Sequence, residues 1–365
     1  MSQFITSPTP DFCWAAPLPS LSFGATSIAI LREMYKRGLQ PAVFPMGGTV
    51  DISAQKPDEA FNKWLSQCIN DAQKSHCRRN RSYRLWHING SLSSYSETDA
   101  RLITFFELDQ LTNDEVNILR NQDKVYVTST FTQEVFKQYG VESTYLPLGF
   151  DSHNFYQLEK RPKIEGATSW SILGKWEFRK SHAQMLKNWV KKYGNDKNHR
   201  LNLAITNQFM KPEHVNSLVS QALDGKSYWN LNFLPWAATN AEYNTVLQSS
   251  DIVLSCSRGE GRDLPCYHAT ALGAWPVALN AHAFRDYLNE DNAILINPNG
   301  KTPASDGVFF SQGGPFNSGN LFTWDDDEFF AACEKAETCV ARGMNIKGLE
   351  LQKNTYSQTL DILLK

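Results

Sequence analysis

The stretch from Ser249 to Asn280 constrains the fold most, because it contains a strand, a turn, a helix and a second strand in one short segment. An apolar, β-branched run (SSDIVLS) leads into a turn with two glycines and a carboxylate (CSRGEG). Pro265 suits a first helical turn, Gly273 suits a helix end, and WPVAL suits the next buried strand. In such a unit the turn lies at the carboxyl end of a strand, where a helix N-terminus can bind phosphate.

The rest of the chain alternates in the same way. We expect a first strand–helix–strand unit over residues 11–50, in which a loop containing Gly24 precedes the helix, and further units up to the end of the chain. The strands include LWHI, which ends near His87, and ILINP, which we expect to be the last. This alternation predicts an α/β protein of two doubly wound, Rossmann-like domains with a cleft between them. We expect the first domain over 1–155, the second over 156–342, and a C-terminal helix over 343–365 that returns to the first domain.

The 249–280 segment resembles the donor-site signature of retaining GT-B glycosyltransferases of family 4, the glycogen-synthase-like group. The resemblance extends to a strand–helix–strand segment at about 125–155. At its end, Pro147, Gly149, Asp151 and Phe155 have the spacing of the family's pattern. The positions of the signature that agree are Asp251, Ser255, Glu260, Gly261, Leu264, Pro265, Ala269, Ala271, Gly273, Pro276 and Val277. The resemblance implies a GT-B fold and transfer of a sugar from a nucleoside-diphosphate sugar.

The resemblance also implies which residues bind the donor. The family has an arginine and a lysine five positions apart after a second-domain strand, and Lys175 and Lys180 stand there in this chain, with Arg179 beside them. Cations in a desolvated cleft stabilise the charge that develops on a departing diphosphate, and such a site can work without a metal. Further donor contacts are expected at Gly24 and along the second-domain signature, at Gly261, Arg262, Asp263, Leu264 and Pro265.

Glu260 is the strongest candidate for a catalytic residue. In the family the equivalent glutamate lies against the transferred sugar, and a second glutamate eight positions on binds the ribose; that position is His268 here. The phenylalanine and glycine that follow the family's glutamate–glycine pair are replaced by Arg262 and Asp263, and Asp tolerates the left-handed backbone that a glycine can adopt. His87 is a second catalytic candidate, since the family often has a cleft histidine at the end of a first-domain strand.

The acceptor is expected on the first domain. The candidates are a basic cluster with an interleaved tyrosine and two residues that follow strands: Arg78, Arg79, Arg81, Tyr83, Arg84, Asn89 and Glu107. Such a cluster can bind a phosphate backbone, although a solvated helix end is the simpler interpretation. A glycan, a small molecule and hydroxymethylated DNA, the substrate of phage enzymes with the same architecture, all remain open as acceptors.

Composition fits an ordinary globular protein. The chain has 365 residues, 20% of them charged, and a net charge of −2, so no global field attracts it to nucleic acid or anionic lipid. No apolar run reaches the length of a membrane span, and the N-terminus does not resemble a signal peptide.

Seven scattered cysteines without a paired motif suggest free thiols and a cytoplasmic protein. Cys256 and Cys266 are expected to be buried fillers, and Asp325 to Asp327 to begin a helix rather than to bind a metal.

The leading prediction is a retaining, metal-independent glycosyltransferase that needs no cofactor beyond its nucleotide-sugar donor. A nucleotide-sugar 2-epimerase has the same fold and acts on the donor alone. A binding protein without turnover is the third possibility, suggested by His268 in place of the second glutamate.

Overall fold

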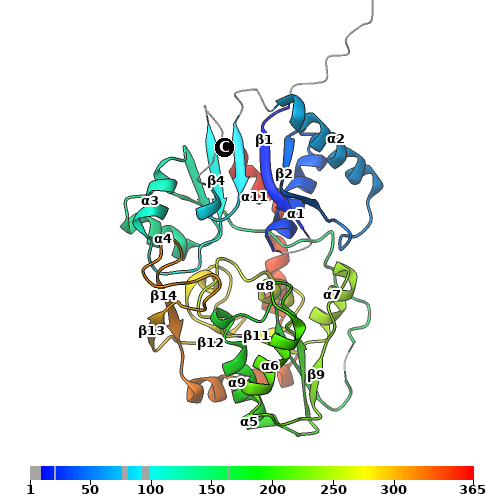
Figure 1. The fold of residues 1–365 in the computed structure, drawn as a ribbon. Helices are drawn as coiled ribbons and strands as arrows, with labels where there is room; N and C mark the ends of the chain where they lie inside the picture. The colour runs from blue at the N-terminus through cyan, green and yellow to red at the C-terminus, as the bar shows by residue number, and fades with distance from the viewer. Residues whose placement is uncertain (1–9, 20–21, 76–80, 92–98, 163) are drawn as a thin grey trace, which may run out of the picture.

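The computed structural model describes residues 10–19, 22–75, 81–91, 99–162 and 164–365, without the side chains of 73–75. The chain folds into two lobes, each built on a parallel six-stranded sheet (Figure 1). This confirms the predicted pair of doubly wound, Rossmann-like domains.

The first sheet has the order β2-β1-β3-β4-β5-β6, with helices between successive strands. Its strands are β1 (Cys13–Leu18), β2 (Ala42–Val50), β3 (Ser82–Leu85), β4 (Ala100–Thr104), β5 (Lys124–Val127) and β6 (Thr144–Tyr145). Its helices are α1 (Ser22–Lys36), α2 (Glu59–Ser75), α3 (Asn113–Arg120) and α4 (Thr130–Gln138). Helix α3 begins with a capping box: the Thr112 side chain accepts from the Glu115 N–H, and the Glu115 carboxylate accepts from the Thr112 N–H.

The second sheet has the order β12-β11-β10-β7-β8-β9. Its strands are β7 (Thr168–Leu173), β8 (His199–Ala204), β9 (Leu231–Phe233), β10 (Ile252–Ser255), β11 (Trp275–Leu279) and β12 (Ile294–Ile296). Its helices are α5 (His182–Tyr193), α6 (Pro212–Ala222), α7 (Asn240–Gln248), α8 (Leu264–Ala271) and α9 (Asp326–Arg342). The strand, helix and strand predicted within 249–280 are β10, α8 and β11.

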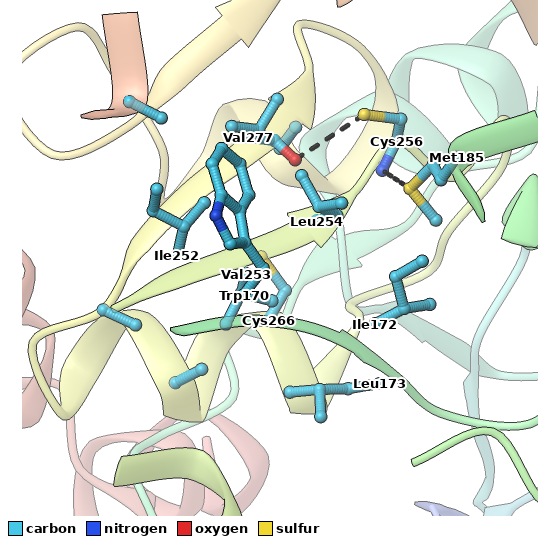
Figure 2. Close-up of a cluster of buried hydrophobic side chains, with 14 of the residues drawn as sticks. Trp170, Ile172, Leu173, Met185, Ile252, Val253, Leu254, Cys256, Cys266 and Val277 are labelled. Atoms are coloured by element: carbon cyan, nitrogen blue, oxygen red, sulfur yellow. Dashed lines mark hydrogen bonds between the residues drawn. The ribbon is translucent and has the colours of Figure 1, made fainter. Parts of the chain in front are cut away.

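A dense apolar layer supports the central strands of the second sheet (Figure 2). Trp170 and Ile172 of β7 and Leu254 of β10 are each at most 1% exposed. Cys256 is buried here, its N–H donating to Met185 Sδ at 3.2 Å and its Sγ lying 3.6 Å from the Val277 carbonyl. Fully burying side chains of this size contributes on the order of 1.5–3 kcal/mol each to stability. The loops that follow β7 and β10 therefore begin at firmly packed strands.

The end of the chain packs on the first domain. After α10 (Ile346–Leu349) and the short helix η4 (Glu350–Lys353), helix α11 (Tyr356–Leu364) lies against α1 and buries Leu360 and Leu363 in the first core (Figure 1). The Tyr83 hydroxyl donates to the Leu363 carbonyl at 2.5 Å. The domain boundaries near 155 and 342 stay predictions.

A hairpin of the second domain also reaches the first. Strands β13 (Gly300–Pro303) and β14 (Asn320–Thr323) follow β12, so the expectation that ILINP is the last strand is wrong. Phe310 and Leu321 of this segment join the apolar cluster formed by α3, α4 and their strands. Polar contacts add to this docking, since the Lys301 ammonium lies 2.9 Å from the Asp109 carboxylate.

Two local expectations in the first domain are also wrong. Gly24 lies inside α1, which starts at Ser22, and not in a preceding loop. A Cβ at Gly24 would lie 1.9 Å from the Pro19 carbonyl oxygen, so the close passage of the chain after β1 requires the glycine. Strand β3 covers 82–85 rather than LWHI, and His87 therefore stands in the loop beyond it.

Candidate functional site

A cavity of about 270 Å³ lies between the two domains. Its walls come from segments that follow β1 to β4 and β6 in the first sheet and β7 to β10 in the second, with one residue from α11. These are the carboxyl ends of parallel strands, which is where open α/β sheets bind ligands. All of the second-domain residues predicted to bind the donor or to act in catalysis line this cavity: Lys175, Arg179, Lys180, Glu260, Gly261, Arg262, Asp263, Leu264, Pro265 and His268.

Two cations enter the cavity from the short helix η2 (Phe178–Lys180), directly after β7. The Lys180 ammonium lies 2.6 Å from Glu260 Oε1, and Arg179 Nη1 lies 2.7 Å from the same oxygen. Both side chains are nearly buried. A buried cation needs a partner, and Glu260 provides one for both.

These contacts belong to one connected network of charged side chains, most of them buried. Arg179 Nη2 also lies 2.9 Å from Glu107 Oε1 and 3.1 Å from Glu177 Oε2. Lys180 Nζ lies 3.9 Å from Asp263 Oδ1. The network contains four carboxylates and three cations, linked through contacts of at most 3.9 Å: Glu107, Glu177, Glu260, Asp263, Lys175, Arg179 and Lys180.

Glu260 is held in its ionised form. Burial alone would raise the pKa of Glu260, but the charges and hydrogen bonds of Arg179 and Lys180 hold it well below its ordinary value. The same carboxylate, with Asp263, raises the pKa of the Lys180 ammonium against the opposing effect of burial. Glu260 is therefore suited to stabilise positive charge rather than to donate a proton.

Helix α8 begins at the cavity, with Asp263 as its N-cap. Asp263 has φ 54°, the left-handed region anticipated from its replacement of a glycine, and its side chain accepts from the Cys266 N–H. The Ser255 hydroxyl donates to its second carboxylate oxygen at 2.5 Å. Burial raises the pKa of Asp263, although Lys180 opposes this effect.

The glycines on either side of Glu260 allow the loop after β10 to approach the first domain. A Cβ at Gly259 would lie 2.5 Å from the Glu107 carbonyl oxygen, and one at Gly261 would lie 2.9 Å from Phe105 Cβ. The Thr128 hydroxyl also donates to the Gly261 carbonyl at 2.8 Å. The loop that carries Glu260 is thus fixed from both domains.

Lys175 stands at a more open part of the cavity. Its ammonium lies 2.9 Å from Glu177 Oε1 and 4.9 Å from the centre of the Phe209 ring. Phe209 is strongly exposed and touches Phe309 at a centroid distance of 6.2 Å. Lys175 keeps 27% of its side-chain surface exposed, so it is accessible from the cavity mouth.

The opposite part of the cavity is apolar and aromatic. His268 of α8 is buried there, with its ring 4.4 Å from the ring of Phe155, and its Nε2 has no hydrogen-bond partner. Burial lowers the pKa of His268 to about 4. Trp236 and Tyr243 continue this wall. A neutral imidazole with one unused nitrogen can hydrogen-bond a ligand hydroxyl.

The first-domain wall contains His87, Glu107 and Phe23. The ring of Phe23 packs edge-on against His87 at 4.7 Å. Desolvation within the cleft, followed by the charges of Lys175 and Arg179, lowers the pKa of His87 to about 4. His87 is therefore a neutral hydrogen-bonding group near the expected position of a sugar.

Of the other residues predicted for the acceptor, those within the described ranges do not line the cavity. Tyr83 is buried in the first core, and Arg81 pairs with Asp99 at 2.7 Å. Arg84 donates to the Gly90 carbonyl, and Asn89 begins the short helix η1 (Asn89–Ser91). Arg78 and Arg79 lie outside the described residues. The described arginines of the basic cluster thus make contacts within the first domain. Among the acceptor candidates that the structure describes, Glu107 is the one that lines the cavity.

Sequence reasoning missed several cavity residues. Glu177 lies between the two predicted lysines and closes the ion network, but a carboxylate in a loop carries no recognisable signal. Trp236, Tyr243 and Phe23 come from segments with no motif, and Tyr356 reaches the cavity from α11. An aromatic residue after a short strand, as in FLPW, is the weak signal that could have indicated Trp236.

The described residues contain neither a recognisable metal site nor a helix suited to cross a membrane. No group of three or more histidine, cysteine, aspartate or glutamate side chains is arranged to hold a metal ion in the part of the chain that is described. None of the described helices combines the length and apolar character that a membrane crossing needs.

Comparisons with known proteins give structural relatives. No protein-family model and no curated protein sequence matches the chain. The sucrose-phosphate synthase of Thermosynechococcus elongatus is similar in structure, with a TM-score of 0.66 at 13% identity over 97% of each chain. A glycosyltransferase from Rickettsia africae has a TM-score of 0.66 at 12% identity over 97% of each chain. Anabaena HepE in complex with UDP and glucose has a TM-score of 0.63 at 12% identity over 98% of each chain. The chain thus has the GT-B arrangement of two Rossmann-like domains around a cleft.

Proposed function

We propose that the chain is a glycosyltransferase that moves a sugar from a nucleoside-diphosphate sugar to a hydroxyl group, with retention and without a metal ion or other cofactor. One observation carries the proposal: Arg179, Lys180, the ionised Glu260 and the start of α8 meet in one cavity between the domains. A diphosphate needs the cations and the helix start, and a sugar that becomes positively charged needs the carboxylate.

The cations act on the leaving group. As the bond between the anomeric carbon and the diphosphate oxygen breaks, the electron pair stays on the diphosphate. Lys180 and Arg179 are nearly buried, so their attraction for this growing charge is weakly screened. Lys175 adds a third cation at the open side. The acceptor oxygen forms the new bond to the anomeric carbon, and its proton passes to the departing diphosphate oxygen.

Glu260 and His87 act on the sugar. The carboxylate of Glu260 faces the cavity in its ionised form and can stabilise an oxocarbenium-like transition state. His87, neutral at physiological pH, can hydrogen-bond a sugar hydroxyl from the first-domain wall. The nucleoside then extends toward His268 and the aromatic wall, where the Nε2 of His268 can bind a ribose hydroxyl.

HepE was crystallised with UDP-glucose, which makes uridine nucleotides the first donors to test. Glycans, small hydroxyl compounds and hydroxymethylated DNA are the acceptors to compare, and Glu107 is the first-domain group that we expect to meet them.

The test is turnover on a panel of UDP-, GDP-, ADP- and dTDP-sugars, with nucleoside diphosphate and sugar products both measured. We expect release of nucleoside diphosphate from one donor, faster with an acceptor, and a loss of about a hundredfold or more in kcat for Glu260→Gln. Release of diphosphate by Glu260→Gln at the wild-type rate would refute the site assignment. A donor that is epimerised without release would favour the 2-epimerase, and binding without any turnover would favour a binding protein.

A further inference from the structure

Arg179 is shared between carboxylates of both domains. Its Nη1 lies 2.7 Å from Glu260 Oε1 and donates to the Gly259 carbonyl, while its Nη2 lies 2.9 Å from Glu107 Oε1. Glu107 belongs to the first domain, in the loop after β4, whereas Glu260 and Glu177 belong to the second. The contact between Arg179 and Glu107 therefore crosses the cleft.

The charge of the network opposes the binding of a diphosphate. With every group ionised, four carboxylates against three cations leave one net negative charge. A diphosphate adds further negative charge beside the largely buried carboxylates of Glu177, Glu260 and Asp263, which is unfavourable without compensation. One carboxylate must therefore leave the cations, or gain a proton, before phosphate oxygens can take its place.

Glu107 is the carboxylate that can leave most easily. It keeps 23% of its side-chain surface exposed, against 6% or less for Glu177, Glu260 and Asp263. It has a single cation partner, while Glu177 and Glu260 each have two. Asp263 is fixed as the N-cap of α8. Separation of the domains would break the Glu107 contact and none of the others.

The titration of Glu107 agrees with this geometry. Burial raises the pKa of Glu107 to about 7, with Glu260 and Glu177 adding to the effect and Arg179 and Lys180 opposing it. A carboxylate that gains a proton near neutral pH can separate from its cation partner at a small cost in free energy.

We propose that the Glu107 carboxylate pairs with Arg179 in the place where the donor diphosphate binds. Donor binding then exchanges this carboxylate for phosphate oxygens. This inference rests on the proposed function, since it assumes that the cavity takes a nucleoside diphosphate. The exchange frees a carboxylate on the first-domain wall, the side from which the acceptor is expected. Donor binding would thus prepare the acceptor side, and the donor would bind first.

The test is calorimetric titration of wild type, Glu107→Gln and Glu107→Ala with the nucleoside diphosphate that the donor panel selects, and with inorganic pyrophosphate. We expect both variants to bind the diphosphate more tightly than wild type, by on the order of tenfold, because a competing charged hydrogen bond is lost. We also expect no gain for the corresponding nucleoside, which has no phosphate. Thermal unfolding of each variant checks that it is folded.

The matched control is Asp109→Asn. Asp109 lies in the same loop and also makes an ion pair across the domains, but its partner is Lys301 and not Arg179. We expect this variant to bind like wild type. An equal gain in Asp109→Asn would mean that any loosening of the domains favours binding, and unchanged or weaker binding in both Glu107 variants would equally overturn the exchange. A wild-type chain that binds no nucleoside diphosphate would instead refute the proposed function itself.

Discussion

At the scale of single residues, the network around Arg179 shows what a sequence can and cannot reveal. Glu260, Lys180 and Arg179 were predicted from their positions in a motif, and the structure brings all three into contact. Glu107, a further partner of Arg179, was predicted only as an acceptor contact, because its pairing with Arg179 depends on how two distant loops meet. Glu177 was not predicted at all. Residues within a motif are predictable, whereas partners supplied by the tertiary fold are not.

Asp263 illustrates a residue whose conformation could be predicted. Its replacement of a family glycine suggested a left-handed backbone, and it has φ 54° at the N-cap of α8. We expect Asp263→Ala to be less stable than Asp263→Asn by about 2 kcal/mol, because alanine cannot cap the helix and is strained in this region. Thermal or urea unfolding of the two variants measures the difference. Equal stability would show that neither the cap nor the backbone conformation matters.

At the scale of secondary structure elements, the periodic segments were predicted well and the irregular ones poorly. The unit β10–α8–β11 follows from its apolar runs and helix-end residues, and the start of α9 follows from the carboxylates of Asp325 to Asp327. Helix α1 begins earlier than expected because Gly24 is accommodated inside it, against Pro19. A glycine in a polar segment usually indicates a loop, and only the tertiary packing reveals this exception.

The hairpin β13–β14 is the element that sequence reasoning could not identify. The Gly- and Asn-rich stretch after β12 has no alternating pattern, since much of it is exposed. Its fold depends on contacts with the first domain, where Phe310 and Leu321 are buried and Asp109 accepts from the Asn320 N–H at 2.8 Å. Elements that are stabilised mainly by a distant part of the chain carry little local signal.

At the scale of the whole molecule, buried histidines connect stability to pH. Burial lowers the pKa of His268 and of His282 to about 4, and that of His182 to about 3. These side chains stay neutral in the folded protein below pH 6.5, while the unfolded chain takes up protons. Stability therefore falls as the pH decreases from about 6.5 to about 4, by up to about 1.4 kcal/mol per histidine and pH unit.

Unfolding temperatures measured from pH 7 to pH 4 check this expectation. Replacing His282 by Gln should reduce the loss of stability over this range, whereas His214→Gln, at an exposed position of α6, should not change it. A flat profile in wild type would contradict the assignment of neutral, buried histidines.

The two domains together form the proposed donor site, and that claim can be measured directly. Calorimetric titration with nucleoside diphosphates compares wild type with Lys180→Met, which removes the ammonium that contacts Glu260, and with Lys187→Met, which removes an exposed lysine of α5. We predict one site per chain for wild type and for Lys187→Met, and affinity weaker by about 10- to 100-fold for Lys180→Met. A Lys180→Met chain that binds as tightly as wild type, or a wild-type chain that binds no nucleoside diphosphate, would contradict the account.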